Sequence, residues 1–115
     1  MIHTPPNVLT IQLKRYVGGA VGYKLNRHLN FSPTLDLRPF VTEANVSPVT
    51  YKLYAVLVHY GTQTTSGHYY CFVLAPSGRW YKMNDAMVCC NVSSADELAS
   101  FWCGMAGPVV KQNTL

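Results

Sequence analysis

The ten residues from Tyr51 to Tyr60 (Y-K-L-Y-A-V-L-V-H-Y) limit the possible folds more than any other stretch of this chain. Aliphatic, β-branched and aromatic side chains dominate the run, which is typical of a β-strand. Its second half is apolar on both faces, which indicates a position in the middle of a sheet. The run therefore predicts a fold that is organised around a sheet.

Two later segments also have the pattern of strands. His68 to Leu74 (H-Y-Y-C-F-V-L) follows a polar loop from Gly61 to Gly67, and Trp80 to Asn84 (W-Y-K-M-N) follows the tight-turn signal Pro76-Ser77-Gly78. Because so short a turn joins antiparallel neighbours, we expect these two segments to form a hairpin.

The first part of the chain has one regular segment and one irregular segment. Val8 to Tyr16 alternates between apolar and polar residues, as a half-buried strand does. Asn26 to Pro48 holds three prolines and predicts a long connection, with short strand pieces around Phe31 and Leu35-Asp36-Leu37.

A helix is predicted near the end of the chain. Ser94 and Glu97 fit a capping box, and an apolar stripe follows at helical spacing. Gly104 is expected to end this helix, and a short strand at Val109-Val110 is possible after it. The predicted fold class is α+β, mainly antiparallel β with one late helix.

Length and charge restrict the class of protein. The chain has 115 residues, which suits one small domain, and about half of them are apolar. The nine lysines and arginines are scattered, so a nucleic-acid partner gets little support, and a mildly basic surface equally suits an acidic protein. With no signal peptide and no stretch apolar enough to span a bilayer, we expect reduced thiols in the cytoplasm or nucleus.

His68 is the candidate general base, because it stands where a polar loop meets an apolar strand. A histidine that transfers protons needs an orienting partner on its other ring nitrogen, and Asn84 or Asp85 at the far end of the hairpin could supply it. The alternative is a surface histidine, with Asn84-Asp85 as a turn before a short strand at Met87-Val88.

The nucleophile is not identified by these patterns. Cys71 lies three residues after His68, which on a strand places the two side chains on opposite faces. The other cysteines, Cys89, Cys90 and Cys103, are expected to be small buried hydrophobes, and Ser66 is a weak alternative nucleophile. No C-x-x-C pair occurs, so no metal site is predicted.

Four blocks of this sequence together resemble the ubiquitin-specific protease family. They are Asn7 to Tyr16, Tyr51 to Gly61, Ser66 to Val73 and Trp80 to Val88. The resemblance is to the C-terminal portion of the catalytic domain, over residues 1–107, with 108–115 as a tail. It implies the palm-type sheet of a papain-like cysteine protease. The residues of the four blocks are most similar to those of the nucleolar deubiquitinase subgroup.

The resemblance also implies roles for individual residues. His68 matches the general base that deprotonates a cysteine, Asn84 matches the third member of the triad, and Asp85 matches a polar position that supports the site. The substrate-binding positions that it implies, along the channel for the C-terminal tail of ubiquitin, are His59, Gly61, Gly67 and Tyr69. No cofactor or metal is implied for these positions.

The chain departs from the family pattern in three ways. It has no glycine-asparagine-x-cysteine box, no paired zinc cysteines, and W-C-G-M-A-G-P-V-V in place of an aromatic-rich closing strand. We therefore expect the second half of a deubiquitinase domain, inactive by itself and completed by an N-terminal half. Ubiquitin and ubiquitinated proteins are the expected partners, and the alternative is a non-catalytic module that binds ubiquitin.

Overall fold

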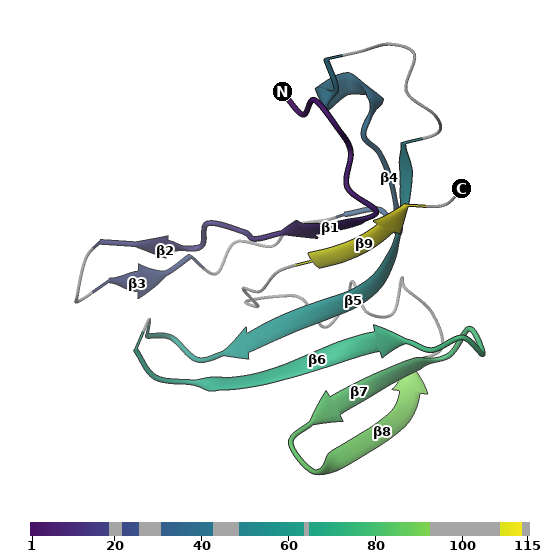
Figure 1. Ribbon diagram of the computed structural model, residues 1–115. Coiled ribbons are helices and arrows are strands. Elements are labelled where there is room, and N and C mark those ends of the chain that lie inside the picture. The colour runs from purple at the N-terminus through teal and green to yellow at the C-terminus, as the bar shows by residue number, and fades with distance from the viewer. Residues whose placement is uncertain (19–21, 26–30, 43–48, 64, 93–108, 114–115) are drawn as a thin grey trace.

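The computed structural model describes residues 1–18, 22–25, 31–42, 49–63, 65–92 and 109–113 (Figure 1). The strands are β1 (Val8–Ile11), β2 (Tyr16–Val17), β3 (Tyr23–Lys24), β4 (Thr34–Asp36), β5 (Thr50–Tyr60), β6 (His68–Leu74), β7 (Trp80–Asn84), β8 (Met87–Val92) and β9 (Val109–Asn113), and a short 3-10 helix, η1, covers Arg38–Phe40. Within these residues, one seven-stranded sheet has the order β1-β9-β5-β6-β7-β8, with β4 also paired to β5, and β2 pairs with β3 separately. All of these strand pairs are antiparallel.

Strand β5 is the centre of the main sheet, as its sequence predicts. It is bonded to β6, β9 and β4, and Figure 1 shows it running the length of the sheet between β9 and β6. The observed bounds of β6 and β7 coincide with the predicted segments. The mainly antiparallel fold class is confirmed, while the predicted helix between Ser94 and Gly104 lies outside the described residues.

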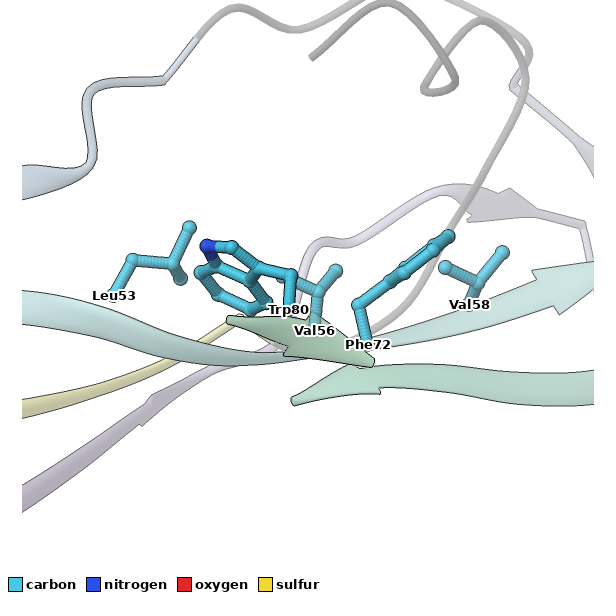
Figure 2. Packing of buried hydrophobic residues seen from close by; sticks show 5 residues of the cluster. All are labelled: Leu53, Val56, Val58, Phe72 and Trp80. Atoms are coloured by element: carbon cyan, nitrogen blue, oxygen red, sulfur yellow. The ribbon is translucent and has the colours of Figure 1, made fainter. Parts of the chain in front are cut away.

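A β-bulge in β5 brings the core together. The register with β9 shifts between Leu53 and Ala55, so Tyr54 is an extra residue in the strand. Without it, the alternation of side chains would turn Leu53 away from Val56 and Val58. With it, these three residues pack in one cluster with the two aromatic side chains of β6 and β7, Phe72 and Trp80, on the same side of the strands (Figure 2).

A second cluster lies at the other end of β5. Its buried members are Leu37, Val41, Val49 and Tyr51, and Ile2, Leu9 and Leu35 pack against them. The Tyr51 hydroxyl donates to the carbonyl oxygen of Pro6 at 2.6 Å, which ties the start of the chain to β5. This cluster holds β1 and β4 in place at the end of the sheet away from the candidate base.

Two segments differ from the predicted elements. The segment from Val8 to Lys14 alternates between exposed and half-buried residues as expected, and Arg15 is buried. Its ladder ends at Ile11, however, and Tyr16 belongs to the separate β2–β3 hairpin. The strand predicted as possible at Val109-Val110 is confirmed and is longer than predicted: β9 lies between β1 and β5 and bonds to both. The physical reason is that β1 and β5 each offer an open ladder edge, and one added strand satisfies the two edges together.

Candidate functional site

The β6–β7 hairpin brings His68 and Asn84 together. Cys71 lies opposite Met83, and one further step along the ladder places Asn84 opposite Tyr70. Asn84 is then a diagonal neighbour of His68 on the same face, which is within reach of their side chains. His68 Nε2 lies 2.5 Å from Asn84 Oδ1. Of the two orienting partners that the sequence offers, Asn84 makes the direct hydrogen bond.

This contact determines which nitrogen of His68 is available as a base. An amide oxygen only accepts hydrogen bonds, so the hydrogen must be carried by Nε2. In the neutral ring, Nδ1 then keeps its lone pair. The His68 side chain is about half exposed, at 47%, so a thiol or a substrate atom can approach it. One ring nitrogen of His68 is therefore held by Asn84 and the other is open, which is the geometry that a general base would need.

Asp85 occupies the turn between β7 and β8. Because Asn84 pairs with Met87, the turn consists of Asp85 and Ala86 alone. Asp85 has a φ of 50°, a left-handed conformation that Asp tolerates better than most residues. Its Oδ2 lies 3.9 Å from His68 Nε2, with the carboxylate exposed. The turn interpretation of Asp85 is therefore confirmed, and its supporting role at the site stays a prediction.

Cys71, Cys89 and the loop serine make no contact with His68, while Cys103 and the side chain of Cys90 lie outside the described part of the structure. Cys71 is half-buried and lies opposite Leu57, on the face away from His68. Cys89 is exposed on β8, so the expectation that it is buried was wrong. It pairs with β7 on one side only, and no described strand covers the other edge of β8. The Ser66 hydroxyl donates to Gln63 instead.

His59 lies beneath the surface rather than on it. It is 2% exposed, its Nδ1 is hydrogen-bonded to the Tyr16 hydroxyl at 2.9 Å, and its ring packs on Tyr69 with centroids 4.7 Å apart. A Cβ added at Gly67 would lie 2.2 Å from His59 Nε2. Only glycine fits at this position, because the ring is held between β2 and β6.

The other predicted substrate-binding residues are accessible. Tyr69 is 56% exposed, Gly67 is exposed, and Gly61 is half-buried. Two accessible elements adjoin His68 in the chain. One is the glycine loop, which we define as residues 61–63 and 65–67, and the other is Tyr69, whose side chain lies on the opposite face of β6 together with His59. His59 supports both of them.

Two residues that contact this region were not identified from the sequence. Tyr16 hydrogen-bonds to His59, and the Lys24 amine donates to the carbonyl oxygen of His59 at 2.6 Å. Both belong to the β2–β3 hairpin, which Figure 1 shows at the same end of the molecule as the loop between β5 and β6. No local pattern marks them, because the contacts cross 35 residues or more of sequence.

Burial changes the acid–base behaviour of His59. Burial first, and the positive charge of Lys24 second, lower the pKa of His59 from its ordinary value of 6.5. The folded chain therefore binds a proton at His59 less readily than the unfolded chain does. Its neutral ring contributes stability that is present above pH 6.5 and is lost as the pH falls below that value toward the folded pKa.

We expect the His59→Gln variant to show a weaker loss of stability in acid than the wild-type chain. Urea unfolding followed at pH 7.5, 6.5 and 5.5 measures this, because the two proteins differ only at residue 59. Parallel stability curves for the two proteins over this pH range would contradict the buried, neutral state of His59.

Neither a metal site nor a membrane-spanning helix is found in the part of the chain that the structure describes. No group of three or more His, Cys, Asp or Glu side chains there could hold a metal ion. No helix among those residues is long and apolar enough to cross a membrane.

Comparison with known sequences identifies a family and several relatives. The family model for ubiquitin carboxyl-terminal hydrolase matches residues 1–100. Mouse ubiquitin carboxyl-terminal hydrolase 17-like protein E is 46% identical over 94 residues, which are 81% of this chain and 17% of that protein. Human ubiquitin carboxyl-terminal hydrolase 42 is 44% identical over 87 residues, 76% of this chain and 6% of that protein. The chain thus spans less than a fifth of the length of these two relatives.

Comparison with solved structures supports the same fold. The SAGA DUB module of Ubp8, Sgf11, Sus1 and Sgf73 bound to monoubiquitin matches with a TM-score of 0.81 and 28% identity, over 98% of this chain and 24% of that chain. The same module bound to ubiquitin aldehyde matches with a TM-score of 0.80 and 27% identity, over 98% and 26%. The mainly antiparallel, papain-like architecture predicted from the sequence agrees with these structures.

Proposed function

Because this chain belongs to the ubiquitin carboxyl-terminal hydrolase family, we propose that it forms the part of a cysteine-type deubiquitinase that supplies the general base. The observation that carries the proposal is the hydrogen bond between His68 Nε2 and Asn84 Oδ1, which leaves Nδ1 open on a half-exposed ring. The carboxylate of Asp85, 3.9 Å from Nε2, adds a negative charge beside the ring. This is the arrangement that nucleophilic catalysis by a thiol requires of its base.

In the proposed reaction, His68 Nδ1 takes the proton of a cysteine thiol that approaches from outside the residues described here. The thiolate attacks the carbonyl carbon of the C-terminal glycine of ubiquitin and forms a thioester. The bond from that carbon to the amine breaks, and His68 returns the proton to the leaving amine. Water then cleaves the acyl-enzyme and releases ubiquitin. Asn84 keeps the imidazole in the productive tautomer throughout, as an acceptor that cannot itself ionise.

The proposed substrate surface is the glycine loop with Tyr69. A chain terminus in extended conformation can approach glycine backbone closely, and Gly67 is exposed in this loop. Tyr69 offers an exposed ring beside the loop. Support comes from the similar modules whose structures were solved with monoubiquitin or ubiquitin aldehyde. We also propose a nuclear or cytoplasmic location, since nothing in the cysteine pattern requires an oxidising compartment.

Grafting tests this proposal. The chimera is mouse 17-like protein E in which the 94 matched residues are replaced by those of this chain. We expect the chimera to hydrolyse a fluorogenic ubiquitin amide and the isolated 115-residue chain to show no turnover. A ubiquitin probe with a thiol-reactive C-terminus should label the chimera and none of the four cysteines of the isolated chain.

The outcomes separate this proposal from its alternative. Labelling of a cysteine in the isolated chain would show that the nucleophile lies within it and would contradict the proposed division of roles. A folded chimera that binds ubiquitin without hydrolysing it would favour the non-catalytic ubiquitin-binding module. The observation behind that alternative is that neither Cys71 nor Cys89 contacts His68.

A further inference from the structure

Lys24 is a buried lysine for which the proposed reaction has no direct use. It lies in β3 and is only 6% exposed. Its Nζ donates to the carbonyl oxygens of His59 at 2.6 Å and of Gly61 at 3.2 Å. Among the described residues, no carboxylate forms an ion pair with it. Lysine is rarely buried without such a partner, because the charge is costly to remove from water.

The two acceptors of Lys24 flank the point where the chain leaves β5 and enters the glycine loop. Two further contacts join the same elements: Tyr23 forms an antiparallel bridge with Gln63, and the Tyr16 hydroxyl bonds to His59. The β2–β3 hairpin is therefore attached to the beginning of the loop at three places.

The beginning and the end of the glycine loop are in contact with each other. A Cβ added at Gly61 would lie 3.0 Å from the Cα of Gly67 and 3.0 Å from the carbonyl oxygen of Ser66. Gly67 directly precedes His68, which starts β6. A shift of Gly61 is therefore transmitted to the backbone that carries the base.

An apolar side chain at position 24 would not replace the amine. It would avoid burying a charge, but it would leave the carbonyl oxygens of His59 and Gly61 without their donor. Burial, and then the charge of Arg15, lower the pKa of Lys24 from 10.5, which means that both disfavour the charged amine. The two hydrogen bonds to the carbonyl oxygens offset this cost in the folded chain.

We propose that Lys24 is a positioning residue. It holds the β2–β3 hairpin against the glycine loop and thereby sets the opening through which an extended chain terminus reaches His68. The proposal rests on the proposed function, because it takes His68 as the base and the tail of ubiquitin as the ligand. Lys24 touches neither of them and acts through the carbonyl oxygens of His59 and Gly61.

The test compares the 115-residue chain with its Lys24→Met, Lys24→Arg and Lys14→Met variants. Lys24→Met keeps the length of the side chain without the donor, Lys24→Arg restores donors, and Lys14→Met removes an exposed lysine. Three quantities are measured for each protein: stability to urea, backbone order of the glycine loop by nitrogen-15 relaxation, and affinity for ubiquitin.

We expect Lys24→Met to lower the order parameters of Gly61 and Gly67 and to weaken ubiquitin binding by about tenfold, which corresponds to about 1.4 kcal/mol. Lys24→Arg should recover most of the affinity, and Lys14→Met should match the wild type in all three quantities. Lys24→Met with lower stability but unchanged loop order and affinity would overturn the proposal.

The proposed function and the Lys24 proposal fail in different ways. If the wild-type chain binds no ubiquitin, the proposed function loses its support, and loop order alone decides the role of Lys24. An ordered glycine loop in Lys24→Met would then overturn the positioning role. A loop that becomes disordered in Lys24→Met and ordered again in Lys24→Arg would support it.

Discussion

The His68→Ala variant of the chimera is expected to hydrolyse the fluorogenic ubiquitin amide at least about a thousandfold more slowly than the chimera itself. Among the described residues of the site, the His68 imidazole offers Nδ1 to a thiol proton, since Nε2 is committed to Asn84. Steady-state measurement of kcat and KM checks this. The loss should fall on kcat, because Tyr69 and the glycine loop remain to bind ubiquitin.

Three further variants sharpen that result. His3→Ala removes an exposed histidine remote in the sequence and should leave the rate unchanged. Asn84→Ala leaves Nε2 without its acceptor and should cost roughly a hundredfold, while Asn84→Asp keeps an oxygen acceptor and should cost much less. Equal rates for His68→Ala and the chimera would contradict the role of His68 as base.

Replacing Gly67 by alanine is expected to disable the site while the fold survives. The new Cβ would lie 2.2 Å from His59 Nε2 and 2.7 Å from the carbonyl oxygen of Tyr60. The His59 ring is buried and hydrogen-bonded, so the backbone of the loop must move instead, and overpacking of this kind costs about 1–3 kcal/mol of stability. Because Gly67 adjoins His68, we expect kcat/KM of the chimera to fall by about a hundredfold or more.

Gly78→Ala is the matched control for this variant. Gly78 has a φ of +79°, so alanine is strained there by about 1–2 kcal/mol, but a Cβ at this position meets no atom within 4 Å. The two variants should lose similar amounts of stability in urea unfolding, while only Gly67→Ala loses activity. Equal activity of the two would show that the closeness of Gly67 to His59 has no functional consequence.

Local alternation of side chains was enough to predict the strands that carry the site. Strand β6 runs from His68 to Leu74 and β7 from Trp80 to Asn84, as their apolar patterns and the Pro76-Ser77-Gly78 turn indicate. The same alternation placed Cys71 on the face opposite His68, which the pairing of Cys71 with Leu57 bears out. These features depend on neighbours a few residues apart, and the sequence contains them in full.

The register between strands could not be read in the same way. Asn84 and Asp85 were both candidates for the partner of His68, because one bulge would exchange them. The regular β6–β7 ladder decides for Asn84 and leaves Asp85 in the turn. The bulge at Tyr54, which no local pattern indicates, likewise decides which residues of β5 meet in the core.

What the sequence determined by itself was therefore the family, the central strands and the identity of the candidate base. Three features were decided by the tertiary structure alone. Strand β9 lies between β1 and β5, His59 is buried beneath the glycine loop, and the Lys24 amine donates to the carbonyl oxygens of His59 and Gly61. The physical reason is distance along the chain. Alternation and turn residues act locally, whereas these contacts join segments whose encounter depends on the pairing of the whole sheet.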